Sequence, residues 1–96
     1  MRKTIAITVY FFTISFSIAS VSFYQEALQS FERDEFELSI KYLEKNIVFN
    51  PKSSDSYILL GKSYSALENS DKAEKYFKIA YTLIPENIEL NYLLGE

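Results

Sequence analysis

The sequence predicts an all-α protein built as a stack of antiparallel helix pairs. The chain repeats itself at an offset of 34 residues, a period typical of helical arrays in which one unit cannot bury its apolar face alone. Within each period, apolar residues recur at helical spacing between short polar turns. The residues that match at this offset are Phe23 and Tyr57, Lys41-Tyr42 and Lys75-Tyr76, Pro51 and Pro85, and Leu59-Leu60-Gly61 and Leu93-Leu94-Gly95.

The N-terminal residues 1–22 differ in composition from the rest of the chain and predict a secretory signal peptide. Arg2-Lys3 precedes an apolar stretch from Ile5 to Ala19, and small residues allow cleavage after Ala19 or Ser22. The alternative is an uncleaved N-terminal membrane anchor, because the segment from Ile5 to Val21 is within reach of the roughly 17–25 residues that span a bilayer. We therefore expect a protein exported to the bacterial periplasm, or one anchored in the inner membrane.

The first repeat covers about residues 20–53. Its first helix should begin at Phe23, and its second should follow the acidic turn at residues 32–35 and end at Asn50-Pro51. Asn46 lies at the edge of the apolar stripe of the second helix. We expect its amide to be hydrogen-bonded or partly exposed, because burying it unpaired would cost about 1–3 kcal/mol. The stripe itself consists of Phe36, Ile40, Leu43 and Ile47.

The second repeat covers about residues 54–87 and has clearer signals. Ser53 or Ser54 can cap its first helix, and Ser70 and Asp71 are suited to starting its second. Apolar residues then line one side of each helix up to the closing proline. They are Tyr57, Leu60, Gly61, Tyr64 and Leu67 in the first helix, and Ala73, Phe77, Ala80, Tyr81 and Ile84 in the second.

Residues 88–96 begin a third repeat. Apolar side chains go nearly all the way round this short helix, so one side can cover the second repeat while the other stays bare. Helical arrays usually need about three units for stability. We therefore expect a fragment of a longer array, or a homodimer through Ile88–Glu96 that Leu93→Glu would weaken. The apolar residues are Ile88, Leu90, Tyr92, Leu93 and Leu94.

A fixed pattern runs through the second repeat: Tyr57, Leu60-Gly61, Tyr64, Ala73, Phe77, Ala80 and Pro85. In residue types and spacings it resembles the tetratricopeptide repeat. The first repeat departs from that pattern at Ser30, Ser39 and Asn46. The resemblance implies a right-handed superhelix of antiparallel helix pairs over residues 23–96, with two full repeats and the start of a third. It also implies a close approach of the helices at Gly61 and Ala80.

In the tetratricopeptide family, ligands lie along the concave face that the first helices of successive repeats form. The resemblance therefore implies a groove made of Tyr24, Leu28 and Phe31 in the first repeat and Ile58, Lys62 and Ser65 in the second. Some family members hold a terminal carboxylate with several Lys, Arg and Asn side chains. Only Lys62 is available here, so that activity is not expected. An equal alternative is that Tyr24, Leu28 and Phe31 serve only packing or self-association.

The composition argues against several function classes. The sequence has no His and no Cys, which excludes Ser-His-Asp and Cys-His sites and the common zinc sites, and its two glycines form no phosphate loop. The acidic cluster at residues 32–37 lacks the central glycine of a calcium loop. A net charge of −3 argues against nucleic-acid binding. We therefore expect no catalytic residue, no metal and no cofactor.

The expected function is that of a non-catalytic scaffold, which binds a peptide or protein partner through the concave face of its repeats. One alternative is a structural module that assembles with itself or tethers a membrane complex. Another is the N-terminal accessory part of a larger enzyme. Contact with a membrane is expected only if the N-terminal segment stays uncleaved.

Overall fold

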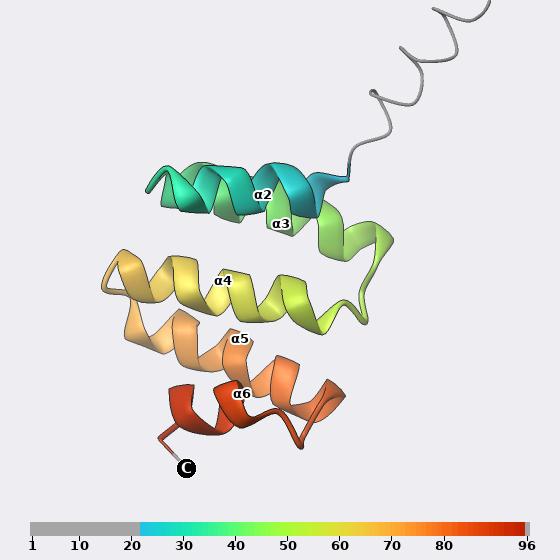
Figure 1. Ribbon diagram of the computed structural model, residues 1–96, viewed down its shortest axis with the longest axis vertical. Coiled ribbons are helices and arrows are strands. Elements are labelled where there is room, and N and C mark those ends of the chain that lie inside the picture. Colours follow the sequence, from blue (N-terminus) through green and yellow to red (C-terminus); the bar gives the residue numbers. More distant parts are fainter. Residues whose placement is uncertain (1–21, 96) are drawn as a thin grey trace, which may run out of the picture.

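The computed structural model describes residues 22–95, and helices make up most of this part of the chain (Figure 1). They are α2 (Phe23–Glu32), α3 (Phe36–Phe49), α4 (Ser54–Ala66), α5 (Ser70–Leu83) and α6 (Ile88–Leu93). The described residues contain no strand, so the predicted all-α class is confirmed. The predicted leader, apart from Ser22, lies outside the described residues. Between residues 22 and 95, no helix is long and apolar enough to cross a bilayer.

The helices stack in chain order, as two pairs followed by the short helix α6 (Figure 1). Each helix packs on the next one along the chain, and α2 also touches α4. Helices α3 and α5 have 14 residues each and begin 34 positions apart, at Phe36 and Ser70. The 34-residue period of the sequence therefore corresponds to one helix pair and its connections.

Side chains cap the start of three helices. Oδ1 of Asn69 accepts a hydrogen bond from the backbone amide of Lys72 at 3.2 Å. Ser22 and Asn87 cap α2 and α6 in the same manner. Each of these bonds satisfies an amide that has no partner inside its helix. The helix-starting role that the sequence suggested for Ser70 is thus supplied by the side chain of the preceding asparagine.

The turn inside each helix pair contains, at the same position, a residue with a left-handed backbone conformation. Asp34 and Glu68, which are 34 positions apart, adopt φ angles of 61° and 62°. In both turns the following residue donates its amide to a carbonyl five residues earlier, at 2.9 Å. This is the Schellman arrangement that ends a helix, and glycine usually occupies its left-handed position. The two turns therefore have equivalent geometry without the usual residue.

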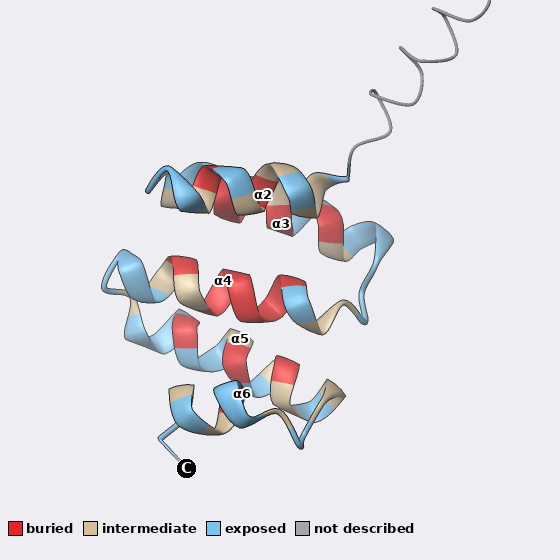
Figure 2. Ribbon diagram, in the orientation of Figure 1, coloured by how far each residue is buried: buried red, intermediate tan, exposed pale blue. Residues whose placement is uncertain are grey.

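Buried residues occur on all five helices, and α4, in the middle of the stack, has more of them than any other helix (Figure 2). At the contact between α4 and α5, a Cβ atom on Gly61 would clash with the ring of Phe77. The ring of Phe77 therefore occupies the space that a side chain at Gly61 would need. Ala80 is also fully buried. The apolar core consists of Ala27, Ile40, Leu43, Tyr57, Ile58, Leu59, Leu60, Ala73, Phe77, Ala80 and Leu90.

The junction between α3 and α4 buries polar side chains from both helices. Nδ2 of Asn46 donates a hydrogen bond to Oγ of Ser56 at 2.7 Å. Two turns away, toward the start of α3 and the end of α4, Oγ of Ser63 lies 3.5 Å from Oγ of Ser39. The expected hydrogen bond of Asn46 is therefore confirmed, whereas partial exposure is wrong, since the residue is only 5% exposed.

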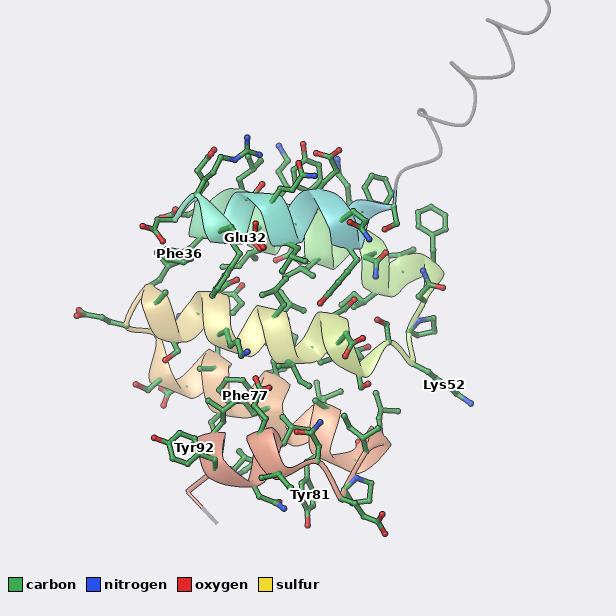
Figure 3. All side chains as sticks on the ribbon, viewed as in Figure 1. Glu32, Phe36, Lys52, Phe77, Tyr81 and Tyr92 are labelled. Carbon is green, nitrogen blue, oxygen red and sulfur yellow. The ribbon has the colours of Figure 1, made fainter. Side chains whose placement is uncertain are left out.

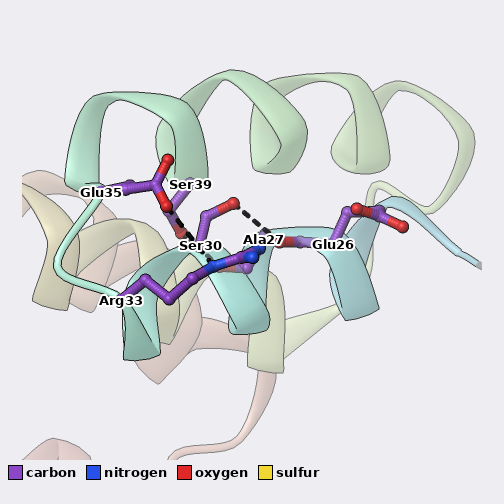
Figure 4. A network of polar contacts seen from close by, with 6 residues as sticks. All are labelled: Glu26, Ala27, Ser30, Arg33, Glu35 and Ser39. Carbon is purple, nitrogen blue, oxygen red and sulfur yellow. Dashed lines mark hydrogen bonds and ion pairs between the residues drawn. The ribbon is translucent and has the colours of Figure 1, made fainter.

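Two serines that interrupt the family pattern bond to the backbone of α2 (Figure 4). Oγ of Ser30 donates to the carbonyl of Glu26 at 2.9 Å, and Oγ of Ser39 donates to the carbonyl of Ala27 at 2.8 Å. Within residues 22–95, every buried side-chain nitrogen and oxygen has a hydrogen-bond partner. Because an unpaired buried hydroxyl would cost about 1–3 kcal/mol, these bonds make serine acceptable inside the helix pair.

Replacing Glu68 with glycine should stabilise the fold. The left-handed conformation costs an L-residue about 1–2 kcal/mol, and glycine largely avoids that cost. We expect Glu68→Gly to raise the free energy of unfolding by about 0.5–1 kcal/mol, measured by urea denaturation and circular dichroism. The control is Glu44→Gly, at an exposed position inside α3, and it should lower this free energy by about 1 kcal/mol. A loss of stability in both variants would contradict the turn geometry.

Candidate functional site

A hollow of about 230 Å³ lies between α2, α4 and the start of α6. We call it the α2–α4 groove. Five of the six residues that the resemblance places on the concave face line it, from two helices that are not consecutive in the chain. These five are Tyr24, Leu28, Phe31, Ile58 and Lys62, and the other lining residues are Asp55, Leu59, Asn87 and Glu89.

Ser65, the sixth of these residues, lies elsewhere. It is exposed near the end of α4 and lines a separate hollow of about 340 Å³ with residues of α5 and α6. Leu93 and Leu94 are among those residues and pack against the core. The residues expected on the concave face therefore line two separate hollows, and Ser65 does not share one with Lys62.

Lys62 is not a free cation, because its Nζ forms an ion pair with Oε1 of Glu89 at the start of α6. The two side chains are 37% and 49% exposed, so the pair lies at the rim of the groove and contributes at most about 1 kcal/mol. Sequence reasoning missed Glu89. The helical period identifies which side of α4 carries Lys62, but it does not show which α6 side chain lies opposite.

The groove carries more negative than positive charge. Asp55 and Glu89 line it with a single cation, Lys62. Burial of the Tyr24 phenol raises its pKa above the ordinary 10.0, and the charges of Asp55 and Glu89 raise it further. Tyr24 is therefore a protonated hydroxyl at neutral pH, beside two carboxylates.

The floor of the groove is apolar and held in place by its neighbours. Ile58 is buried, while Tyr24, Leu28 and Phe31 are half-buried and pack against the core. The ring of Phe31 meets that of Phe36 on α3 edge-on, with centroids 5.3 Å apart, which restricts its motion. An apolar floor with a charged rim suits the binding of a side chain from another molecule.

The described residues contain no group of His, Cys, Asp or Glu side chains that could hold a metal ion. A scan against models of known protein families finds no match for the chain, and a search of curated proteins finds no similar sequence.

Removing the charge of Asp55 should lower the pKa of Tyr24. Asp55→Asn takes away a charge that opposes ionisation of the phenol, while burial, the larger cause of the shift, remains. Tyr24 should therefore ionise at a lower pH than in the unaltered protein. The measurement is the absorbance of tyrosinate as a function of pH. Subtracting the curve of the same protein with Tyr24→Phe isolates the signal of Tyr24 from that of the other tyrosines.

The control for this titration is Asp71→Asn. Asp71 is the acidic residue in the first turn of α5, as Asp55 is in α4, but it does not line the groove. It should leave the pKa of Tyr24 unchanged. Equal shifts in the two variants would contradict the placement of Asp55 beside Tyr24.

Proposed function

We propose that residues 23–96 form a tetratricopeptide-type module that binds a segment of a peptide or protein partner in the α2–α4 groove. The proposed module is a right-handed superhelix with two full repeats and the start of a third, and it is not an enzyme. The observation that supports binding is the convergence of five expected groove residues, from helices far apart in the chain, on one hollow. The proposed location is outside the cytoplasm, with residues 1–22 as signal peptide or anchor.

The chemistry of the groove favours a particular kind of partner segment. Tyr24, Leu28 and Phe31 supply apolar surface, which suits an aliphatic or aromatic side chain. Asp55 and Glu89 outnumber Lys62 at the rim, which suits a neighbouring Lys or Arg. The partner that fits both features is a segment with an apolar residue next to a basic one.

Random peptides displayed on phage and selected on the full chain test this proposal. Enriched peptides should share an apolar residue beside Lys or Arg. A synthetic copy of the most enriched peptide, labelled with fluorescein, is then titrated with the protein by fluorescence anisotropy. Asp55→Lys should weaken its binding by about three- to tenfold, because one attractive charge becomes repulsive.

The matched control is Asp71→Lys. It makes the same charge change at the same position of a first helical turn, but outside the groove. Its affinity for the peptide should equal that of the unaltered protein. Equal weakening by both variants, or enriched peptides without basic residues, would contradict the proposed site.

The exposed side of α6 supports a second proposal, self-association through Ile88–Glu96. Leu90 is fully buried against the stack, whereas Ile88 and Tyr92 are 84% and 83% exposed. Figure 3 shows the side chain of Tyr92 projecting from α6 away from the other helices. Two large apolar side chains on one short helix offer a surface that a second copy could cover.

A substitution at Ile88 tests this association better than one at Leu93. Leu93 is half-buried and packs against the core, so Leu93→Glu would disturb the stack itself. Ile88→Glu changes only the exposed side. We expect sedimentation velocity at about 100 μM, well above micromolar dissociation constants, to show a dimer that Ile88→Glu converts to monomer. A monomer in both cases would exclude association through α6.

A further inference from the structure

One end of the stack, where α2 begins and α3 ends, exposes a group of apolar side chains. Val48 and Phe49 are 75% and 71% exposed, although both belong to a regular helix. The ring of Phe23 stacks on that of Phe49 with centroids 6.1 Å apart, and on that of Tyr42 at 6.5 Å. A shallow hollow of about 450 Å³ lies beside Phe49. Folding alone leaves this surface uncovered.

Cations border the apolar surface. Nζ of Lys45 lies 5.8 Å from the centroid of the Phe23 ring. Lys52 lines the hollow beside Phe49, and Figure 3 shows its side chain pointing away from the helices. We call Phe23, Lys45, Val48, Phe49 and Lys52 together the Phe49 edge.

Glu44 and Asp55, the carboxylates nearest in sequence to Lys45 and Lys52, affect tyrosines outside the Phe49 edge. Asp55 lines the α2–α4 groove and raises the pKa of Tyr24. Burial raises the pKa of Tyr64, and the charge of Glu44 raises it further. The pKa of Tyr76 is raised by burial first, then by Tyr64 and then by the charge of Glu44. The Phe49 edge therefore combines aromatic and aliphatic groups with positive charge. Side chains of these kinds favour the interface of an anionic bilayer.

The position of the edge along the chain adds an independent argument. Phe23 is separated by only three residues, Ser20, Val21 and Ser22, from Ala19, where the apolar stretch that begins at Ile5 ends. Three extended residues span at most about 11 Å. A bilayer that holds this apolar sequence would therefore lie next to Phe23, and next to Phe49, which stacks on it.

We propose that the Phe49 edge rests on the headgroup region of an anionic lipid bilayer and orients the helical stack on the membrane. Val48 and Phe49 enter the interface, while Lys45 and Lys52 meet lipid phosphates. A second copy of the chain fits this edge less well, because a two-fold contact would bring the lysines of one copy close to those of the other. The inference does not depend on peptide binding in the α2–α4 groove.

The sequence contains no tryptophan, so a single introduced tryptophan reports its own surroundings. The full chain carrying Phe49→Trp is reconstituted into phosphatidylcholine vesicles with and without phosphatidylglycerol. We expect a blue-shifted emission that brominated lipid acyl chains quench, more strongly when phosphatidylglycerol is present. Val48→Trp should behave in the same way.

Tyr92→Trp provides the positional control, because Tyr92 is equally exposed but lies on α6 at the other end of the stack (Figure 3). Its emission should stay unquenched in the same vesicles. Emission from Phe49→Trp and Val48→Trp that matches that of Tyr92→Trp would overturn the proposal. A blue shift without quenching by brominated lipid would also overturn it, since it would place the edge against protein.

The lysines are tested in the Phe49→Trp background. Lys45→Gln with Lys52→Gln should remove the extra quenching due to phosphatidylglycerol, since each lysine near an anionic surface favours contact by about fivefold. Lys72→Gln with Lys75→Gln is the matched control, because each Nζ also lies over an aromatic ring, 5.2 Å from the centroid of Tyr64 and 5.4 Å from that of Tyr76, but on α5. Equal effects of the two changes would contradict the role given to Lys45 and Lys52.

Discussion

The junction between α3 and α4 holds the two helix pairs in one stack, and it does so with buried polar side chains. Asn46 bonds to Ser56, and Ser39 lies opposite Ser63, between helices that also share apolar contacts. A shift of one helix along the other would leave the buried amide of Asn46 unpaired, at about 1–3 kcal/mol, whereas the hydroxyls of Ser39 and Ser63 would keep the backbone carbonyls to which they donate. The bond between Asn46 and Ser56 therefore fixes the register of α3 against α4. Because α2 is bound to α3, the same register sets α2 beside α4 and forms the groove.

Much of this arrangement follows from the sequence, and what does not follow has physical reasons. The 34-residue period and the prolines that close each unit predict the helix pairs, because both reflect the chain's local geometry. The left-handed residues Asp34 and Glu68 were not predictable, since neither is glycine. The ion pair between Lys62 and Glu89, and the separation of Ser65 from the groove, depend on where α6 packs. Periodicity determines which side of a helix is buried, but not which helix covers it.

The negative and positive charges of this small domain gather at different parts of its surface, which its net charge does not show. Carboxylates of Asp55 and Glu89 collect at the α2–α4 groove, whereas Lys45 and Lys52 border the exposed aromatic end of the stack. Both regions combine apolar surface with one predominant sign of charge. Such surfaces discriminate between partners through charge while apolar contact supplies most of the affinity. The partner site and the membrane edge that we propose therefore occupy different parts of the stack.

The measurement that tests the central claim most directly is nuclear magnetic resonance of the α3–α4 junction in solution. Nδ2 of Asn46 lies 2.7 Å from Oγ of Ser56, so the Asn46 side-chain amide protons should show nuclear Overhauser effects to the Ser56 β-protons. Backbone ¹⁵N relaxation should give the pair α2–α3 and the pair α4–α5 one common rotational correlation time. Absence of these Overhauser effects, together with separate correlation times for the two pairs, would contradict a single stack and remove the basis of the groove.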